Sequence, residues 1–288
     1  MRVGVTFPQT ELGGDPGAVR AYGERVEELG FTHILSYDHV VGADPAVHTR
    51  WNGPYDVHTT FHEPFVMYGY LAAVTQKVEL VTGVIILPQR QTALVAKQAA
   101  EVDLLSGGRL RLGIGVGWNA VEYEALGEHF GNRGKRSAEQ IDLLRRLWTE
   151  PTVTFDGEFH KVTGAGLAPM PVQQPIPVWI GAASSPGYKR AGQLADGWFP
   201  MMRPGAKLDE ARAVVGRAAA DAGRDPAAVG MEGRVNWRGD SDAALGELKQ
   251  WADAGASHVS VNTMGAGLKT VDDHLEALAQ VAASLPVD

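Results

Sequence analysis

The sequence predicts an α/β protein whose residues 1–288 form a single (β/α)8 barrel, or TIM barrel. Three observations support this fold class: eight short apolar segments, a helical pattern after each of them, and a composition that provides a large core. The chain has 288 residues, of which 44% are hydrophobic and 21% are charged. α/β barrels of this length commonly form one domain.

The first half of the chain provides four predicted strands and the helices that follow them. The strands are expected at residues 3–7, 33–37, 78–87 and 110–114, and the helices at 15–29, 64–75, 91–105, 122–126 and 137–148. Asp15-Pro16 is a helix start signal and Gly30 is a stop signal. On the helix 91–105, we expect four side chains to face the core: Leu94, Ala99, Val102 and Leu105.

Two irregular segments follow the fourth strand. Residues 130–136 are expected to form a basic turn between two helices. Residues 153–160 are expected to form a small hairpin around an Asp156-Gly157 turn. Because this hairpin lies outside the repeating pattern, we interpret it as an insertion after the fourth strand.

The second half of the chain continues the alternation. Four prolines make residues 168–177 extended, and this segment leads into the fifth strand. The strands are expected at 178–181, 197–200, 230–235 and 258–262, and the helices at 187–195, 208–222, 243–254 and 271–283. Eight strands, each followed by a helix, predict a closed barrel and not an open, doubly wound sheet.

Polar residues follow the second strand, where barrel enzymes keep their chemistry. Asp38-His39 comes directly after the strand, and residues 42–63 form a long segment rich in glycine, proline, histidine and aromatic residues. A loop of this length is usually functional or disordered.

The fourth strand and its exit contain glycines at every second position, Gly113, Gly115 and Gly117. Glycine weakens a strand, so this spacing indicates that a ligand or another strand approaches the backbone closely. Tight barrel packing alone is the alternative. A dinucleotide fingerprint is excluded because the glycine spacing is wrong by one residue and no suitably placed acidic residue follows.

Composition limits the function classes. A formal net charge of -8 without a basic cluster argues against nucleic-acid or membrane-surface binding, so the expected partner is a small molecule. The absence of cysteine excludes disulfides and thiol catalysis. No histidine and carboxylate spacing indicates a metal site. The first residues have the pattern of a strand and lack the features of a signal peptide. No apolar run reaches membrane-spanning length. We therefore expect a cytoplasmic protein.

Several motifs together resemble the luciferase-like monooxygenase superfamily, whose members share a variant of this barrel. The motifs are Tyr37-Asp38-His39, residues 82–88, 96–100 and 105–110, Gly115-Val116-Gly117-Trp118 with Glu122, and residues 195–200. The resemblance covers nearly the whole chain. It looks most similar to the branch that uses the deazaflavin coenzyme F420, with FMN as the alternative cofactor.

The resemblance implies a cofactor ring in the barrel mouth, a homodimer and a non-proline cis peptide at Gly83-Val84. It also implies a phosphate site in the loop after the fifth strand, at Gly181-Ala182-Ala183-Ser184. Consecutive backbone N–H groups, hydroxyls and a helix start suit a phosphate there. Arg90 would add charge. As alternatives, Ser184 or Ser185 caps the helix, and Arg90 is a solvated loop residue.

His39 is the candidate proton donor or acceptor, because imidazole exchanges protons near neutral pH. Asp38 would orient it or contact the ring, and the alternative is a structural histidine. Trp51 and Trp118 are candidate substrate-stacking residues, or simple packing residues. The expected cofactor contacts are Asp38, Gly83, Val84, Arg90, Gly115, Gly117 and residues 181–184.

One departure from the family pattern bears on the reaction. Where sugar-phosphate-oxidising relatives carry a glutamate after the fourth strand, this chain has Trp118, and the nearest acid is Glu122. Sugar-phosphate oxidation is therefore disfavoured. Three hypotheses follow: hydride transfer between F420 and a small organic substrate, an oxygen-inserting monooxygenase that uses reduced FMN, and a non-catalytic flavin-binding barrel.

Overall fold

The computed structural model describes residues 1–285 and confirms the predicted α/β barrel. The barrel strands are β1 (Arg2–Thr6), β2 (His33–Ser36), β3 (Glu79–Thr82), β5 (Leu110–Gly115), β8 (Val178–Ala182), β9 (Gly197–Pro200), β10 (Gly230–Asn236) and β11 (His258–Asn262). The helices are α1 (Pro16–Glu28), α2 (Pro64–Val74), α3 (Thr92–Ser106), α4 (Ala120–Ala125), α5 (Arg133–Thr149), α6 (Ser185–Leu194), α7 (Ala206–Asp221), α8 (Ser241–Asp253) and α9 (Val271–Ala282). Within the described residues, no helix has both the length and the apolar character needed to cross a membrane.

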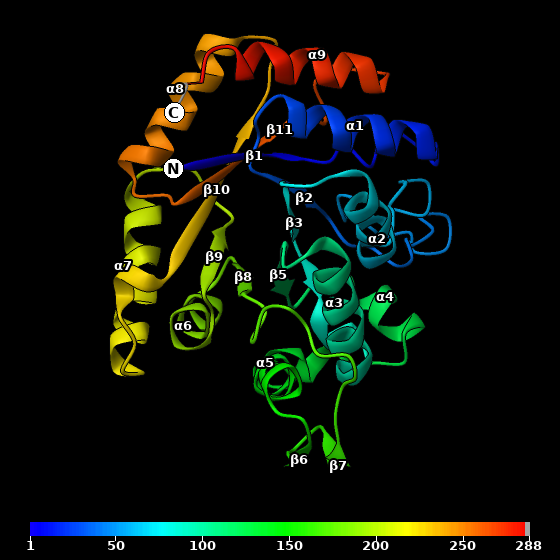
Figure 1. Ribbon diagram of the computed structural model, residues 1–288, viewed down its shortest axis with the longest axis vertical. Coiled ribbons are helices and arrows are strands. Elements are labelled where there is room, and N and C mark those ends of the chain that lie inside the picture. Colours follow the sequence, from blue (N-terminus) through cyan, green and yellow to red (C-terminus); the bar gives the residue numbers. More distant parts are fainter. Residues whose placement is uncertain (286–288) are drawn as a thin grey trace.

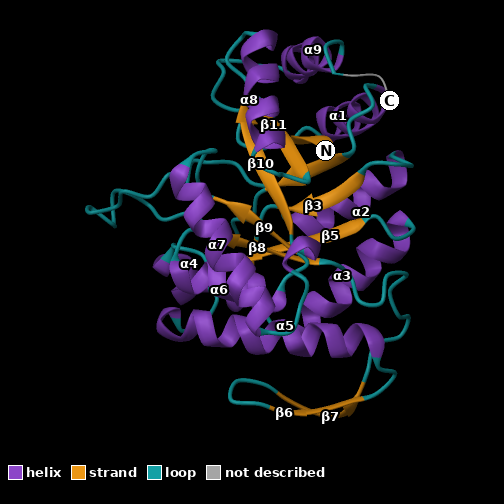
Figure 2. Cartoon of the chain, turned by 90° about the vertical axis from the view of Figure 1, so that its left-hand side faces the viewer, coloured by secondary structure: helices purple, strands orange, loops and turns teal. Residues whose placement is uncertain are grey.

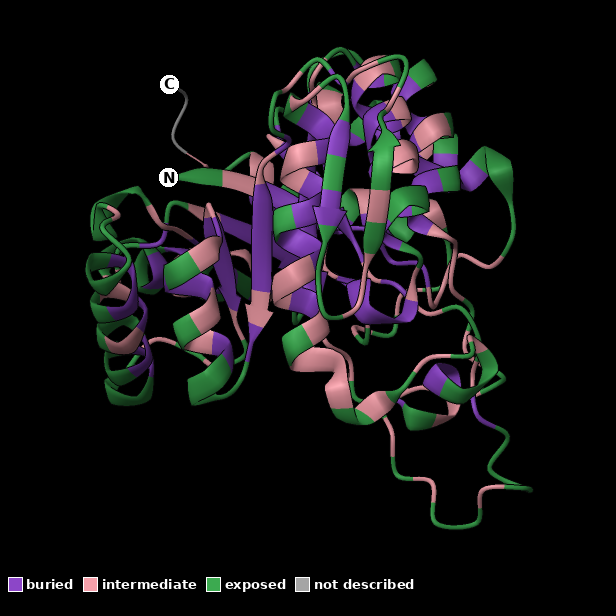
Figure 3. Ribbon diagram, turned by 90° about the horizontal axis from the view of Figure 1, so that it is seen from below, coloured by how far each residue is buried: buried purple, intermediate pink, exposed green. Residues whose placement is uncertain are grey.

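All eight barrel strands run parallel, and the ring closes through a pairing between β3 and β5. The helices surround the strands (Figure 1). Viewed from below, the buried residues gather on the strands and on the helix faces turned toward them (Figure 3). Parallel strands end at one rim, so the loops after the strands meet at a common barrel mouth.

The helix boundaries follow the signals in the sequence. The side chain of Asp15 accepts a hydrogen bond from the N–H of Gly17 at 2.8 Å, and Gly30 after the helix has φ +83°. Thr270 and Asp273 form a reciprocal capping box at the start of α9. These caps satisfy N–H groups that have no partner within the helix.

The third strand differs from the predicted continuous segment 78–87. The peptide bond between Gly83 and Val84 is cis, as expected, and it separates β3 from β4 (Ile85–Ile86). A short 3-10 turn, η1 (Leu87–Gln89), follows. The prediction of the cis peptide is confirmed, and the strand is interrupted at that point.

The alternating glycines of β5 make room for this interrupted strand. A Cβ atom on Gly113 would overlap the carbonyl oxygen of Thr82, and one on Gly115 would lie 2.6 Å from Cγ2 of Val84. On Gly117 it would lie 2.7 Å from Cγ2 of Ile86. The close approach is therefore made by a neighbouring strand, as one of the interpretations of the glycine pattern predicted. Contact of Gly115 and Gly117 with a cofactor stays a prediction.

The insertion after the fourth strand is confirmed, but its turn is longer than predicted. Strands β6 (Val153–Asp156) and β7 (Lys161–Ala165) pair with Asp156 opposite Lys161, so residues 157–160 form the loop in place of an Asp-Gly turn. The carboxylate of Glu139 in α5 accepts N–H groups from Glu158 and Phe159 and orders this loop. The hairpin stands apart from the barrel, beyond α5 (Figure 2).

Two predictions about helices were wrong. Leu94 and Leu105 are 52% and 66% exposed, whereas Ala99 and Val102 are buried as expected. At about 100° per residue, Leu94 and Leu105 lie roughly 140° and 120° around the helix from Ala99. The segment 130–136 is not one turn, because a 3-10 turn (Phe130–Asn132) leads directly into α5 at Arg133.

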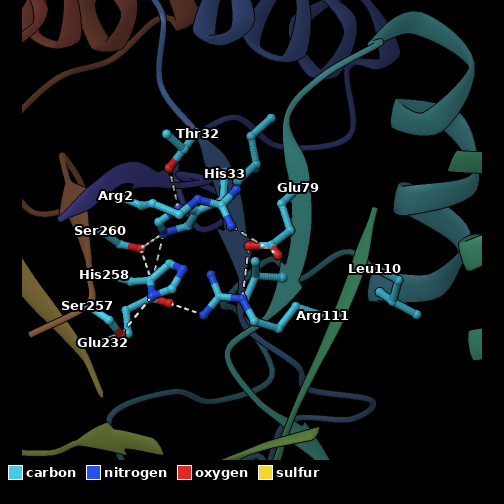
Figure 4. A network of polar contacts seen from close by, with 12 residues as sticks. Arg2, Thr32, His33, Glu79, Leu110, Arg111, Glu232, Ser257, His258 and Ser260 are labelled. Carbon is cyan, nitrogen blue, oxygen red and sulfur yellow. Dashed lines mark hydrogen bonds and ion pairs between the residues drawn. The ribbon is translucent and has the colours of Figure 1, made fainter. Parts of the chain in front are cut away.

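A network of buried charges fills the end of the barrel opposite the mouth (Figure 4). Arg111 donates from Nη1 to Glu232 at 2.6 Å and from Nε to Glu79 at 2.9 Å. Nε2 of His33 lies 2.9 Å from Oε1 of Glu232. His258 packs its ring 5.8 Å from that of His33. Although burial opposes it, the charges of Arg111 and His33 hold the pKa of Glu232 far below its usual value.

The network makes the fold sensitive to acid. Burial, together with the nearby charges of Arg111 and His33, lowers the pKa of His258 from 6.5 to about 3. Between these values the unfolded chain binds a proton at His258 that the folded protein does not, so stability falls as pH falls. Below about pH 4.5, protonation of Glu232 in the unfolded chain adds to the loss. The melting temperature is expected to drop from pH 7 to pH 4.

A His258→Gln variant tests this prediction when its melting temperature is measured across the same pH range. Its melting temperature should change less between pH 6.5 and 4.5 than that of the wild type. His58→Gln, which alters an exposed loop histidine, is the matched control. Equal pH dependence in the wild type and in His258→Gln would contradict the assignment.

Candidate functional site at the barrel mouth

The direction of each side chain in the barrel follows from strand alternation. A Cβ atom on Gly233 would meet the ring of Trp251 in α8, so residue 233 faces the helices. Its neighbours Glu232 and Arg234 therefore face the barrel interior. Glu232 belongs to the buried network, and Arg234 lies one step closer to the mouth, where it is exposed.

An apolar cluster forms the floor beneath the mouth. It consists of Leu35, Val81, Trp179 and Phe199, with Tyr37 and Val84 packed against it. The side chain of Val84 fills the space beside Gly115 and Gly181, as a Cβ atom on Gly181 would lie 3.2 Å from Cγ1 of Val84. Gly83, Val84, Gly115 and Gly181 thus come together, as expected for one wall of a cofactor site. Their contact with a cofactor remains a prediction.

His39 lies in the loop after β2 and contacts Glu122 of α4. Nδ1 of His39 lies 3.5 Å from Oε2 of Glu122, whose side chain is 1% exposed. Asn119 caps α4 by accepting the N–H groups of Val121 and Glu122, which fixes the helix that carries this carboxylate.

The carboxylate of Glu122 is surrounded by N–H donors. Oε1 accepts the N–H groups of Val40 at 2.5 Å and Val41 at 3.3 Å, and Oε2 accepts Nε2 of Gln89 at 3.0 Å. Burial raises the pKa of Glu122, but the hydrogen bonds from His39, Val40 and Gln89 outweigh it and lower the pKa. A carboxylate held ionised beside Nδ1 favours a proton on that nitrogen, which leaves Nε2 for proton exchange.

The carboxylate of Asp38 makes its hydrogen bonds to groups other than His39. Its carboxylate accepts the N–H of Ile86 at 3.0 Å and Nη2 of Arg90 at 2.8 Å. It therefore braces the interrupted third strand, and the carboxylate beside His39 is that of Glu122. Contact of Asp38 with a cofactor ring stays a prediction. Burial raises the pKa of Asp38 despite the charge of Arg90.

Arg90 is not a solvated loop residue. Besides Asp38, its guanidinium binds Oε1 of Glu63 at 2.9 Å. Among the described residues, none of its hydrogen bonds or ion pairs reaches residues 181–184. A role for Arg90 at a phosphate therefore stays a prediction.

Aromatic side chains cover His39. The rings of Phe61, Tyr55 and Trp118 lie 4.7, 5.1 and 5.6 Å from the imidazole, all edge-on, and Trp51 lies 5.5 Å from Trp118. A cavity of about 160 Å³ opens beside His39. It is lined by Val40, Val41, Gly42, Tyr55, Asp56, Val57, Thr59, Phe61 and Asn119. The loop 42–63 thus provides Tyr55 and Phe61 as cover for the site. Of the two predicted tryptophans, Trp118 lies beside His39, and Trp51 lies against Trp118.

Residues 181–184 connect β8 to α6. Ser184 is the N-cap residue of α6, but its side chain forms no capping hydrogen bond. The helix thus begins after Ser184, as the capping alternative states, but without the side-chain hydrogen bond of a cap. The backbone N–H groups at this helix start suit a phosphate, which stays a prediction.

Sequence reasoning missed the roles of Glu122 and Arg234. In the sequence, Glu122 belongs to a family motif and is the acid nearest to Trp118. The structure adds that it stands three residues after the capping residue Asn119, on the first turn of α4. Arg234 was not considered, although it alternates with Glu232 on a predicted strand. Its Nη1 donates to the hydroxyl of Tyr37 at 3.1 Å.

Replacing Glu122 with glutamine is expected to lower turnover about 10- to 100-fold, the usual cost of removing the partner that orients a functional histidine. The amide no longer favours a proton on Nδ1, so ¹⁵N NMR of His39 should show a smaller fraction of that tautomer. Glu124→Gln, an exposed change on the same helix, is the control. Unchanged tautomer populations in Glu122→Gln would refute the orienting role.

Comparisons with known proteins agree with this geometry. The chain is 31% identical over 241 residues to an F420-dependent glucose-6-phosphate dehydrogenase of Intrasporangium calvum, covering 79% of this chain and 68% of the relative. It is 30% identical to pyrimidine monooxygenase RutA of Allorhizobium ampelinum, covering 77% and 59%. The crystal structure of an F420-dependent secondary alcohol dehydrogenase with an F420-acetone adduct matches with a TM-score of 0.79 at 18% identity, over 97% and 98% of the chains.

The family model described as luciferase-like monooxygenase matches residues 1–284, nearly the whole chain. Relatives within this family include F420-dependent and monooxygenase enzymes. With its parallel barrel, its interrupted third strand and the histidine at its mouth, this chain belongs to the luciferase-like monooxygenase family.

Proposed function

We propose that the chain is an oxidoreductase that transfers a hydride between the deazaflavin F420 and a small organic substrate at the barrel mouth. The observation that carries this proposal is His39, which is oriented by the buried carboxylate of Glu122 and lies beside a cavity. A hydride transfer to or from carbon needs a matching proton transfer, and imidazole provides it near neutral pH.

The mouth suits a flat conjugated ring. Leu35, Val81 and Phe199 supply an apolar floor, and the glycines beside Val84 bring no side chain of their own into the wall. Residues 181–184, at the start of α6, would hold the phosphate of the cofactor. The bound deazaflavin would supply the hydride chemistry.

The protein itself would bind, orient and exchange protons. Glu122 holds the proton on Nδ1 of His39, so Nε2 delivers or removes the proton at the reacting atom. Tyr55, Phe61 and Trp118 shield the imidazole from water, which strengthens the electrostatic interactions at the site. Reduction of an activated C=C, C=N or C=O bond and oxidation of an alcohol use the same proton path in opposite directions.

An FMN-dependent monooxygenase is the second candidate. The aromatic cover over His39 favours it, because oxygen chemistry on a reduced flavin needs a site from which water is excluded. The family includes enzymes of this kind, such as pyrimidine monooxygenase RutA. Deazaflavin does not readily activate oxygen, so the two candidates differ in their need for O2.

The test is oxidation of reduced cofactor by the purified protein without oxygen. The protein is mixed anaerobically with reduced F420 and a panel of activated alkenes, imines and ketones, and F420 absorbance is followed. We expect oxidation with at least one acceptor at a one-to-one ratio of cofactor to product. No oxidation with any acceptor, together with formation of an oxygenated product that needs both reduced FMN and O2, would favour the monooxygenase.

A further inference from the structure

Arg234 is a cation at the barrel mouth that has no counter-charge among the described residues. It faces the interior because its neighbour Gly233 faces Trp251 of α8. Its register partner on β11, Ser260, also faces inward, where the Ser260 hydroxyl binds Glu232. Among residues 1–285, the guanidinium forms no ion pair, and its side-chain hydrogen bond is to the hydroxyl of Tyr37.

The charged layer below Arg234 is arranged differently. There Arg111 is 2% exposed and binds two carboxylates, Glu232 and Glu79. The arginine of the structural network is thus paired with acids, while the exposed arginine at the mouth has no acidic partner within residues 1–285. An interior cation without a counter-charge is suited to an anionic group of a bound molecule.

The polar side of the mouth extends beyond Arg234. Nδ2 of Asn262 donates to Oδ1 of Asn236 at 2.9 Å, and both residues follow the inward alternation of their strands. Thr6 is the register partner of Asn262 on β1, and its hydroxyl is fully buried without a hydrogen-bond partner. Tyr37, which binds Arg234, also packs against the apolar cluster that includes Phe199.

We infer that Arg234 and Tyr37 form an anion-binding pair that takes an oxyanion on the edge of a flat molecule lying on the apolar floor. The guanidinium supplies the charge, and the hydroxyl of Tyr37 fixes its position. The oxyanion belongs either to the ring of the cofactor or to the substrate. The inference rests on the proposed function only if the oxyanion belongs to the cofactor.

The experiment compares Arg234→Gln with Arg234→Lys, which keeps the charge, and with Arg217→Gln, which removes an exposed arginine on α7. Dissociation constants are measured by fluorescence for F420 and FMN. In the cofactor-free protein, dissociation constants are also measured for benzoate and for its uncharged analogue benzamide. Thermal melting checks that each variant is folded. Because Arg234 is exposed, we expect its replacement to leave the fold intact.

If the cofactor supplies the oxyanion, Arg234→Gln binds it at least tenfold more weakly than the wild type, while Arg217→Gln is unchanged. If the substrate supplies it, cofactor affinity is kept, the wild type prefers benzoate over benzamide by at least tenfold, and Arg234→Gln loses that preference. Arg234→Lys should lie between wild type and Arg234→Gln. Equal affinities of wild type and Arg234→Gln for all probes would overturn the inference. Failure of the wild type to bind either cofactor would count against the proposed function alone, because the benzoate comparison still tests the pair.

Discussion

Replacing His39 with alanine is expected to lower the rate of hydride transfer about 100- to 10,000-fold, the range that general acid–base catalysis contributes. The dissociation constant of the cofactor should stay close to the wild-type value, because the apolar floor and residues 181–184 are unchanged. Single-turnover absorbance of F420 measures the rate, and fluorescence titration measures binding.

His58→Ala is the control, since it removes an exposed imidazole from the same loop region. A His39→Ala variant that transfers hydride at the wild-type rate would make His39 a structural residue packed among Tyr55, Phe61 and Trp118. Loss of cofactor binding together with activity would show that its role is not limited to proton exchange.

Replacing Arg111 with leucine is expected to lower the free energy of unfolding by about 3–5 kcal/mol, the usual cost of leaving a buried ion without its partner. Glu232 is 2% exposed and would face an apolar side chain in place of the guanidinium 2.6 Å away. Urea denaturation at pH 7 measures the change.

Arg2→Gln is the matched control because Arg2 also pairs with Glu79, at 3.6 Å, but from a half-exposed position. Its loss should cost less than about 1 kcal/mol. Adding Glu232→Gln to Arg111→Leu should recover part of the stability, because it removes the orphaned charge. A single-variant cost below about 1 kcal/mol would contradict the structural role of the network.

The sequence predicted the barrel because its strands are short, buried and regularly separated by capped helices. Strands 197–200 and 258–262 have the expected bounds, since glycine or turn residues stand at their ends. The break in the third strand was predictable only at Gly83-Val84, where family resemblance pointed to a cis peptide. The hairpin loop was not predictable, because Glu139 of a different element stabilises it.

The sequence predicted single residues of the site, but it did not predict which of them pair with one another. His39 could be chosen for its chemistry and its place after β2. Its partner Glu122 lies 83 positions away, and only the closed barrel brings the two together. Asp38, the sequence neighbour, points instead to Ile86 and Arg90. Likewise, the structure shows that Glu79 and Glu232 pair with Arg111 and so are not the partners of Arg234. This pairing could not be predicted from the sequence.

The choice of cofactor tests the central claim most directly. The purified protein, freed of bound small molecules, is incubated with equal concentrations of F420 and FMN, separated from unbound cofactor, and its absorbance spectrum is recorded. Our account predicts that F420 is retained and that FMN is not. Retention of FMN in place of F420 would contradict it.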